Sequence, residues 1–132
     1  MKYMLMMHYT DFGVPEMSQW TPAEISAHIQ FMHDFDRELT ESGELLVSDG
    51  LAGPDQARVV RSRPGTGPEV TDGPFAEVKE FLAGFWIVDC DTPDRALAIA
   101  ARVSAAPGPA GEPLNMPITV QPVMSAPPSD EI

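Results

Sequence analysis

Two apolar segments constrain the fold of this chain more than any other feature. Residues 2–9 read KYMLMMHY and residues 81–90 read FLAGFWIVDC, so nearly every position in both is apolar. Successive side chains of a strand point to opposite faces of its sheet. Both faces of these strands are therefore apolar, as in sheets that are covered on both sides. Neither run is long enough to cross a bilayer as a helix.

Length and charge narrow the class of protein. The 132 residues predict one domain over residues 1–124, followed by a polar tail over 125–132. A net charge of -12 disfavours nucleic acid and anionic membrane surfaces as partners. The single cysteine, Cys90, cannot form an internal disulfide, and the first residues lack a signal-peptide pattern, so we expect a cytoplasmic protein. No metal-ligand spacing or cofactor fingerprint is present, which predicts neither a metal nor a cofactor.

Two segments have the features of helices. Residues 21–42 begin with Thr21 as N-cap, Pro22 as first helical residue and Glu24 as the partner in a capping box. Residues 92–106 begin with the same Thr-Pro pair. Helical spacing predicts a buried stripe in each: Ile25, Ile29, Met32 and Leu39 in the first, and Leu97, Ala98, Ala101 and Val103 in the second.

The remaining strands complete a known fold topology. Residues 44–52, 57–62 and 116–124 read as strands, with a short extended piece at 69–71 that pairs with 57–62 as a hairpin. The order is a ferredoxin-like α+β fold, βαββαβ, with an extra hairpin. Two helices cover only one face of such a sheet. A second copy of the chain is the simplest cover for the other face, which predicts a homodimer that forms a dimeric α/β barrel.

Three stretches carry a resemblance to a known family. They are MKYMLMMHY at the start, TDGPFAEVKEFLAGFWIVDC in the middle and PITVQPVM near the end. The chain resembles the bacterial DGPF-domain, YCII-related proteins from residue 1 to about residue 124. The resemblance implies the dimeric α/β barrel, a pocket between sheet and helices, and a His–Asp pair as its acid–base group. It also implies small cyclic or aromatic substrates, as in lactone isomerisation and dehydrochlorination, and an association with sigma factors of the extracytoplasmic-function type.

The DGPF run offers both structural and functional interpretations. Asp72 and Gly73 form a strong turn pair, so Asp72 either caps its own turn or acts in a pocket as base or orienter. Phe75 is expected to pack inward or to form a pocket wall. Lys79 is part of a solvated charge pair or holds an anionic substrate.

Histidines and one helical carboxylate are the other candidates. His8, near the end of the first strand, is the best acid–base candidate, and His28 lies at the edge of the first helix's stripe. His33 lies at the opposite edge. Asp36 falls on the apolar stripe, where a carboxylate must be paired or face a wet cavity. If the stripe is displaced by one position, Phe35 is inside and Asp36 lies at its rim.

Two functions remain open from the sequence. The first is a cofactor-independent lyase or isomerase, with His8 moving the proton, Asp72 or Asp36 orienting it, and Lys79, Phe75 and His28 lining the substrate site. The second is a binding or regulatory module without turnover, associated with a sigma factor. The two are separated by whether His8 and a carboxylate converge on one cavity.

Overall fold

The computed structural model describes residues 1–9, 17–73 and 81–124. In chain order its elements are β1 (Lys2–Tyr9), η1 (Met17–Gln19), α1 (Pro22–Glu41), β2 (Leu45–Gly50), η2 (Pro54–Gln56), β3 (Arg58–Arg61), β4 (Glu69–Asp72), β5 (Phe81–Asp89), α2 (Pro93–Ser104), η3 (Pro109–Gly111) and β6 (Ile118–Pro122). Phe75 and Lys79, the two candidates in segment 74–80, lie outside the described residues, as does the tail 125–132.

The sheet has the ferredoxin-like order. Its strands run β2-β5-β1-β6, and every neighbouring pair is antiparallel. β3 and β4 pair with each other in a separate two-stranded sheet. The predicted α+β class and its extra hairpin are therefore confirmed. The sheet of one chain is open, without closing into a barrel, and Pro122 ends its edge strand β6.

Both helices begin as the sequence predicts. The Thr21 side chain accepts from the Glu24 amide at 3.1 Å, and the Glu24 carboxylate accepts from the Thr21 amide at 2.8 Å. This reciprocal pair satisfies two amides that have no partner inside the helix. Thr92 accepts in the same way from the Arg95 amide at 3.2 Å.

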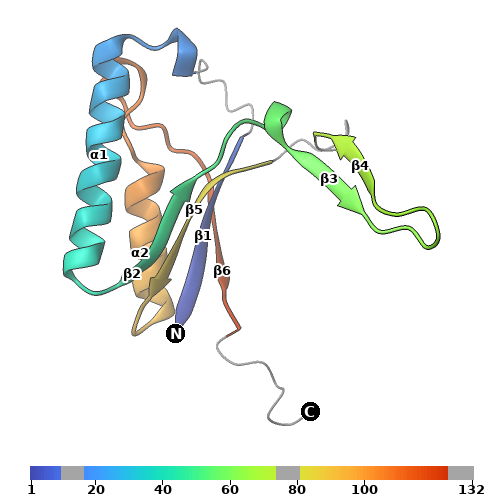
Figure 1. The fold of residues 1–132 in the computed structure, drawn as a ribbon. Coiled ribbons are helices and arrows are strands. Elements are labelled where there is room, and N and C mark those ends of the chain that lie inside the picture. The colour runs from blue at the N-terminus through green and yellow to red at the C-terminus, as the bar shows by residue number, and fades with distance from the viewer. Residues whose placement is uncertain (10–16, 74–80, 125–132) are drawn as a thin grey trace.

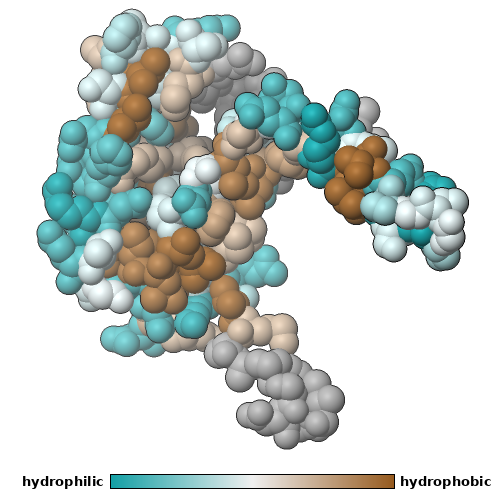
Figure 2. All heavy atoms as spheres, viewed as in Figure 1, coloured by the Kyte–Doolittle hydropathy of each residue, from teal (hydrophilic) through white to brown (hydrophobic). Residues whose placement is uncertain are grey.

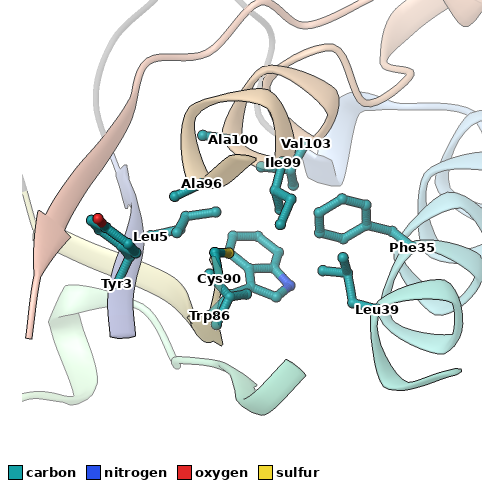
Figure 3. Packing of buried hydrophobic residues seen from close by; sticks show 11 residues of the cluster. Tyr3, Leu5, Phe35, Leu39, Trp86, Cys90, Ala96, Ile99, Ala100 and Val103 are labelled. Carbon is teal, nitrogen blue, oxygen red and sulfur yellow. The ribbon is translucent and has the colours of Figure 1, made fainter. Parts of the chain in front are cut away.

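The core lies between the two helices and one face of the sheet (Figure 1). In Figure 3, side chains of α1 and α2 point toward those of β1 and β5. Those drawn are Tyr3, Leu5, Phe35, Leu39, Trp86, Val88, Cys90, Ala96, Ile99, Ala100 and Val103. Phe35 meets Trp86 edge to face, with ring centroids 6.0 Å apart, a favourable aromatic geometry.

The predicted helix stripes were partly wrong. On α1 the buried residues are His28, Phe35 and Leu39, whereas Ile29 is 45% exposed. On α2 they are Ala96, Ile99, Ala100 and Val103, whereas Leu97 is 55% exposed. Each helix carries apolar residues on more than one side, so helical spacing alone did not determine which side is buried. The alternative in which Phe35 is inside is the one observed.

The second face of the sheet is not covered by either helix (Figure 1). Cross-strand partners share a face, and Met4 pairs with Ile87 as Met6 does with Phe85. All four are partly exposed. We call this side, away from the helices, the open face; brown hydrophobic residues gather on this part of the molecule and on the β3–β4 hairpin in Figure 2.

Candidate functional site

His8 lies on the open face of the sheet, near the end of β1. Tyr3 and Leu5 of the same strand are buried under the helices. Alternation along the strand therefore directs His8 to the opposite side, together with Met4 and Met6. His8 is opposite Leu82 of β5, after an irregularity in register at Met7. Its side chain is partly exposed.

Asp49 shares the open face with His8. It is opposite Phe85 of β5, which in turn is opposite Met6 of β1. Two strand spacings put Asp49 about 10 Å to the side of Met6, and His8 lies about 7 Å further along β1. The two polar groups therefore lie on the same face with apolar positions between them, and they do not bond directly to each other.

Sequence reasoning missed Asp49. Its signal was the alternation of β2, in which Val47 and Asp49 occupy the same face. Val47 is opposite Ile87, a central residue of the open face. Because the register between β2 and β5 shifts at Leu46, the sequence alone did not show which residues of β2 share a face with His8.

Apolar side chains occupy the positions between the two polar groups. Phe85, Leu82 and Met6 occupy neighbouring positions of β5 and β1 on the open face, and each is partly exposed. Gly84, beside them, allows the backbones to approach closely. A Cβ placed on Gly84 would lie 3.3 Å from the Asp49 carbonyl oxygen and 3.3 Å from Met7 Cε. A side chain at this position would therefore crowd β2 and β1.

Asp36, a residue of α1, lies on the helix-covered side of the sheet. Its Oδ1 accepts from Trp86 Nε1 at 2.9 Å, and its Oδ2 accepts from Ser48 Oγ at 2.9 Å. Ser48 and Trp86 are cross-strand partners on the helix-covered face. Both carboxylate oxygens thus have partners that tie α1 to β2 and β5.

The sheet separates His8 from Asp36 within one chain. Asp36 bonds to Trp86 on the covered face, and His8 projects from the open face. The two do not converge on a shared cavity in a single copy. The structure instead brings His8 and Asp49 to one face.

Asp72 is the last residue of β4, on the hairpin. Its carboxylate lies 3.3 Å from Arg58 Nε, and its side chain is 91% exposed. Gly73 follows with a φ of +63°, which suits glycine, and its amide donates to the Ala57 carbonyl at 2.7 Å. Gly73, the second residue of the predicted turn pair, therefore has a backbone conformation that suits a turn, and it lies at the foot of the hairpin.

The rest of the DGPF run lies outside the described residues. Phe75 and Lys79 belong to segment 74–80. The segment is bounded by Gly73, at the foot of the hairpin, and by Phe81, which is opposite Tyr9. Tyr9 Oη donates to the Leu51 carbonyl at 3.0 Å. Phe81, Tyr9 and Leu51 therefore meet at the end of the sheet that carries His8.

His28 is buried beneath the loop that follows α2. Its Nδ1 lies 2.9 Å from the Pro107 carbonyl oxygen, and Trp20 contacts its ring edge-on at 5.5 Å. With 8% of its surface exposed, it packs at the helix interface away from the open face. His33 is exposed on α1.

Four titratable groups in the described part of the chain have shifted pKa values: Glu24, Glu44, Cys90 and Arg95. Bonds from Arg95 Nε and Nη2, each 2.8 Å, lower the pKa of Glu44 to about 2. Burial raises the pKa of the Cys90 thiol, which keeps it protonated and unreactive. Cys90 is therefore a packing residue of the core.

Residues 1–9, 17–73 and 81–124 contain neither a candidate metal cluster nor a candidate membrane-spanning helix. No three His, Cys, Asp or Glu side chains in those ranges are grouped closely enough to hold a metal ion. Within the same ranges, no helix combines the length and apolar character needed to span a membrane.

Comparison with known proteins identifies the family. A model of the YCII-related domain matches residues 1–110. The chain belongs to the YCII-related family. This YCII-related chain is also 35% identical over 98 residues to the uncharacterized protein R00369 of Rhizobium meliloti (strain 1021), across 74% of this chain and 77% of the relative. The region matched by the family model includes His8 and Asp49, and the relative's name carries no activity.

Proposed function

We propose that the protein is a homodimer whose sheets pack with their open faces together and enclose a small-molecule site around His8. The observation that carries the proposal is the open face itself, which combines an apolar centre with one imidazole and one carboxylate. Partly exposed apolar side chains gathered on one face are typical of an interaction site. A second copy would remove it from water and desolvate the polar groups at its edge.

The proposed chemistry is proton transfer in a cofactor-independent lyase or isomerase reaction. An imidazole both donates and accepts protons, and a carboxylate accepts them. His8 removes a proton from a small cyclic or aromatic substrate; in an isomerisation the imidazolium returns that proton at another carbon, and in a lyase reaction a leaving group departs with the electron pair. The Asp49 carboxylate accepts a hydrogen bond from a substrate hydroxyl and so orients the substrate. Asp72 remains a candidate for the same site, because the chain returns from it to Phe81, beside Tyr9 at the His8 end of the sheet.

Turnover is tested with a panel of small lactones and chlorinated hydroxyquinones, followed by proton release. We expect His8→Gln to lower kcat/KM by roughly 100-fold or more, the usual size of a general acid–base contribution. Asp49→Asn should reduce it as well. His33→Gln on the exposed side of α1 is the matched control and should leave the rate unchanged. Absence of turnover, together with equal ligand binding by His8→Gln and wild type, would end the catalytic proposal.

A second function is a binding or regulatory module without turnover. It is favoured by the position of Asp36, whose two oxygens are bonded to Trp86 and Ser48 and which lies across the sheet from His8. On this proposal the open-face site binds a ligand, and the dimer associates with an extracytoplasmic-function sigma factor. Calorimetry with the same panel, and co-purification with such a sigma factor, separate it from the enzyme: binding that depends on His8 but never leads to product supports the module.

A further inference from the structure

The β3–β4 hairpin, Arg58–Asp72, is the structural feature that the proposed site does not explain. We call it the arm. β3 and β4 pair only with each other in the described sheets. In Figure 1 the arm extends from the end of the sheet toward the side away from the helices, and Figure 2 shows it standing clear of the body. A two-stranded hairpin is at best marginally stable in water by itself.

One face of the arm is apolar at its centre. Val60 is opposite Val70, so the two side chains share a face. They are 63% and 57% exposed. The ion pair between Arg58 and Asp72 occupies the next position on that face. A valine pair bordered by charges has the composition of a small contact surface, with an apolar centre and a polar rim.

Charge indicates what kind of surface the arm meets. It contains three arginines, at 58, 61 and 63, and two carboxylates, Glu69 and Asp72, for a net charge of +1. The whole chain carries -12, so the other residues carry -13. Arg61 makes no ion pair within the described ranges, whereas Arg58 and Arg63 do. A basic arm beside an acidic body is complementary to the body of another copy.

We propose that the arm is a dimer clasp that packs its Val60–Val70 face on the body of the second copy. This inference rests on the face-to-face dimer proposed above. The arm and the open face lie on the same side of the molecule, so a copy docked on the sheet lies within reach of the arm. In a twofold dimer the same contact occurs twice, once from each copy. The clasp adds a second contact region, built from different residues, to the sheet-to-sheet interface.

The first test measures the dimer dissociation constant by analytical ultracentrifugation. Val60→Asp/Val70→Asp removes four valine contacts per dimer, and each half-exposed valine is worth roughly three- to tenfold in affinity. We expect the constant to rise by at least about 100-fold. Leu97→Asp, on the exposed side of α2, is the matched control and should not change it. Ile87→Asp on the open face should weaken the dimer independently of the arm.

Deleting most of the arm is a second test, which still applies if the Val60→Asp/Val70→Asp variant does not fold. The Gly73 amide and Ala57 carbonyl are bonded at the foot of the arm, so a two-residue Gly-Gly linker can replace residues 59–71. The four-stranded sheet does not use these residues. We expect circular dichroism of the helices to be retained and dimer affinity to fall at least as far as in the double substitution.

Hydrogen exchange identifies which copy the arm contacts. Protection of the β3 and β4 amides should rise with protein concentration across the monomer–dimer transition. Protection that is the same in monomer and dimer would place the arm on its own chain and overturn the clasp. A dimer whose affinity is unchanged by the Val60/Val70 variant and by the deletion would also overturn the clasp while leaving the sheet dimer intact. A wild-type protein that stays monomeric would contradict both the clasp and the sheet-to-sheet dimer.

Discussion

Asp36→Ala should destabilise the fold far more than an ordinary surface substitution. It leaves Trp86 Nε1 without its acceptor in a residue that is 5% exposed. An unsatisfied buried donor costs about 1–3 kcal/mol, and the lost Ser48 bond adds about 1 kcal/mol. We therefore expect the free energy of unfolding to fall by about 2–4 kcal/mol, measured by urea denaturation followed by far-UV circular dichroism.

Asp34→Ala is the matched control for this prediction. Asp34 lies on the same helix, and its 3.0 Å ion pair with Arg37 is on the surface. Such pairs contribute about 0–1 kcal/mol. The Asp36 substitution should therefore cost at least about 1 kcal/mol more than the control.

A double-mutant cycle tests the physical reason. Trp86→Phe removes the donor, so Asp36→Ala in that background no longer leaves a buried N–H unsatisfied. The coupling between the two positions should be about 1–2 kcal/mol. If Asp36→Ala costs no more than Asp34→Ala, or if the coupling is near zero, the carboxylate does not act as the acceptor that ties α1 to the sheet.

Three further predictions concern the loss of stability at low pH, the packing of a glycine in the sheet, and a helix N-cap. Glu44→Gln should cost about 1 kcal/mol at pH 7, after allowing for the partly exposed Arg95. Since folding lowers the Glu44 pKa from 4.5 to about 2, this stability is present above about pH 4.5 and disappears toward pH 2, where urea titrations of both proteins should agree. Gly84→Ala should cost about 1–3 kcal/mol through crowding, whereas Gly50→Ala, at its cross-strand partner with nothing within 4 Å, should change thermal stability much less. Thr21→Ala should cost about 1 kcal/mol in the same assay, and Thr21→Ser should restore most of it; equal stability of both variants would refute the cap.

Local sequence patterns determined the elements themselves. The strand predicted over 2–9 is β1, Lys2–Tyr9, and the helix predicted over 21–42 is α1, Pro22–Glu41. Period-two apolarity and the capping box depend on residues within a few positions of one another, so they are readable without a partner. The ferredoxin-like order then follows from the sequence of elements and their short connections.

Only the tertiary structure decided which polar side chains meet. Asp36 bonds to Trp86, 50 residues away, and His28 to the Pro107 carbonyl, 79 residues away. Neither partner leaves a local signal at the histidine or the aspartate. The same contacts helped to decide which side of α1 faces the rest of the protein. Hydrogen bonds to distant partners allow His28 and Asp36 to lie on that side, where helical spacing predicts apolar residues.

The candidate site shows the same division. Strand alternation could place His8 opposite to Leu5, but it could not say which of the two faces the helices cover. Packing of α1 and α2 on the Leu5 face left His8 open and put Asp36 across the sheet from it. The pairing register of β2 with β5, shifted at Leu46, then brought Asp49 to the same face as His8. Register and face are set by contacts between distant strands and helices. For that reason the sequence alone suggested His8 as a candidate but did not show that Asp49 shares its face.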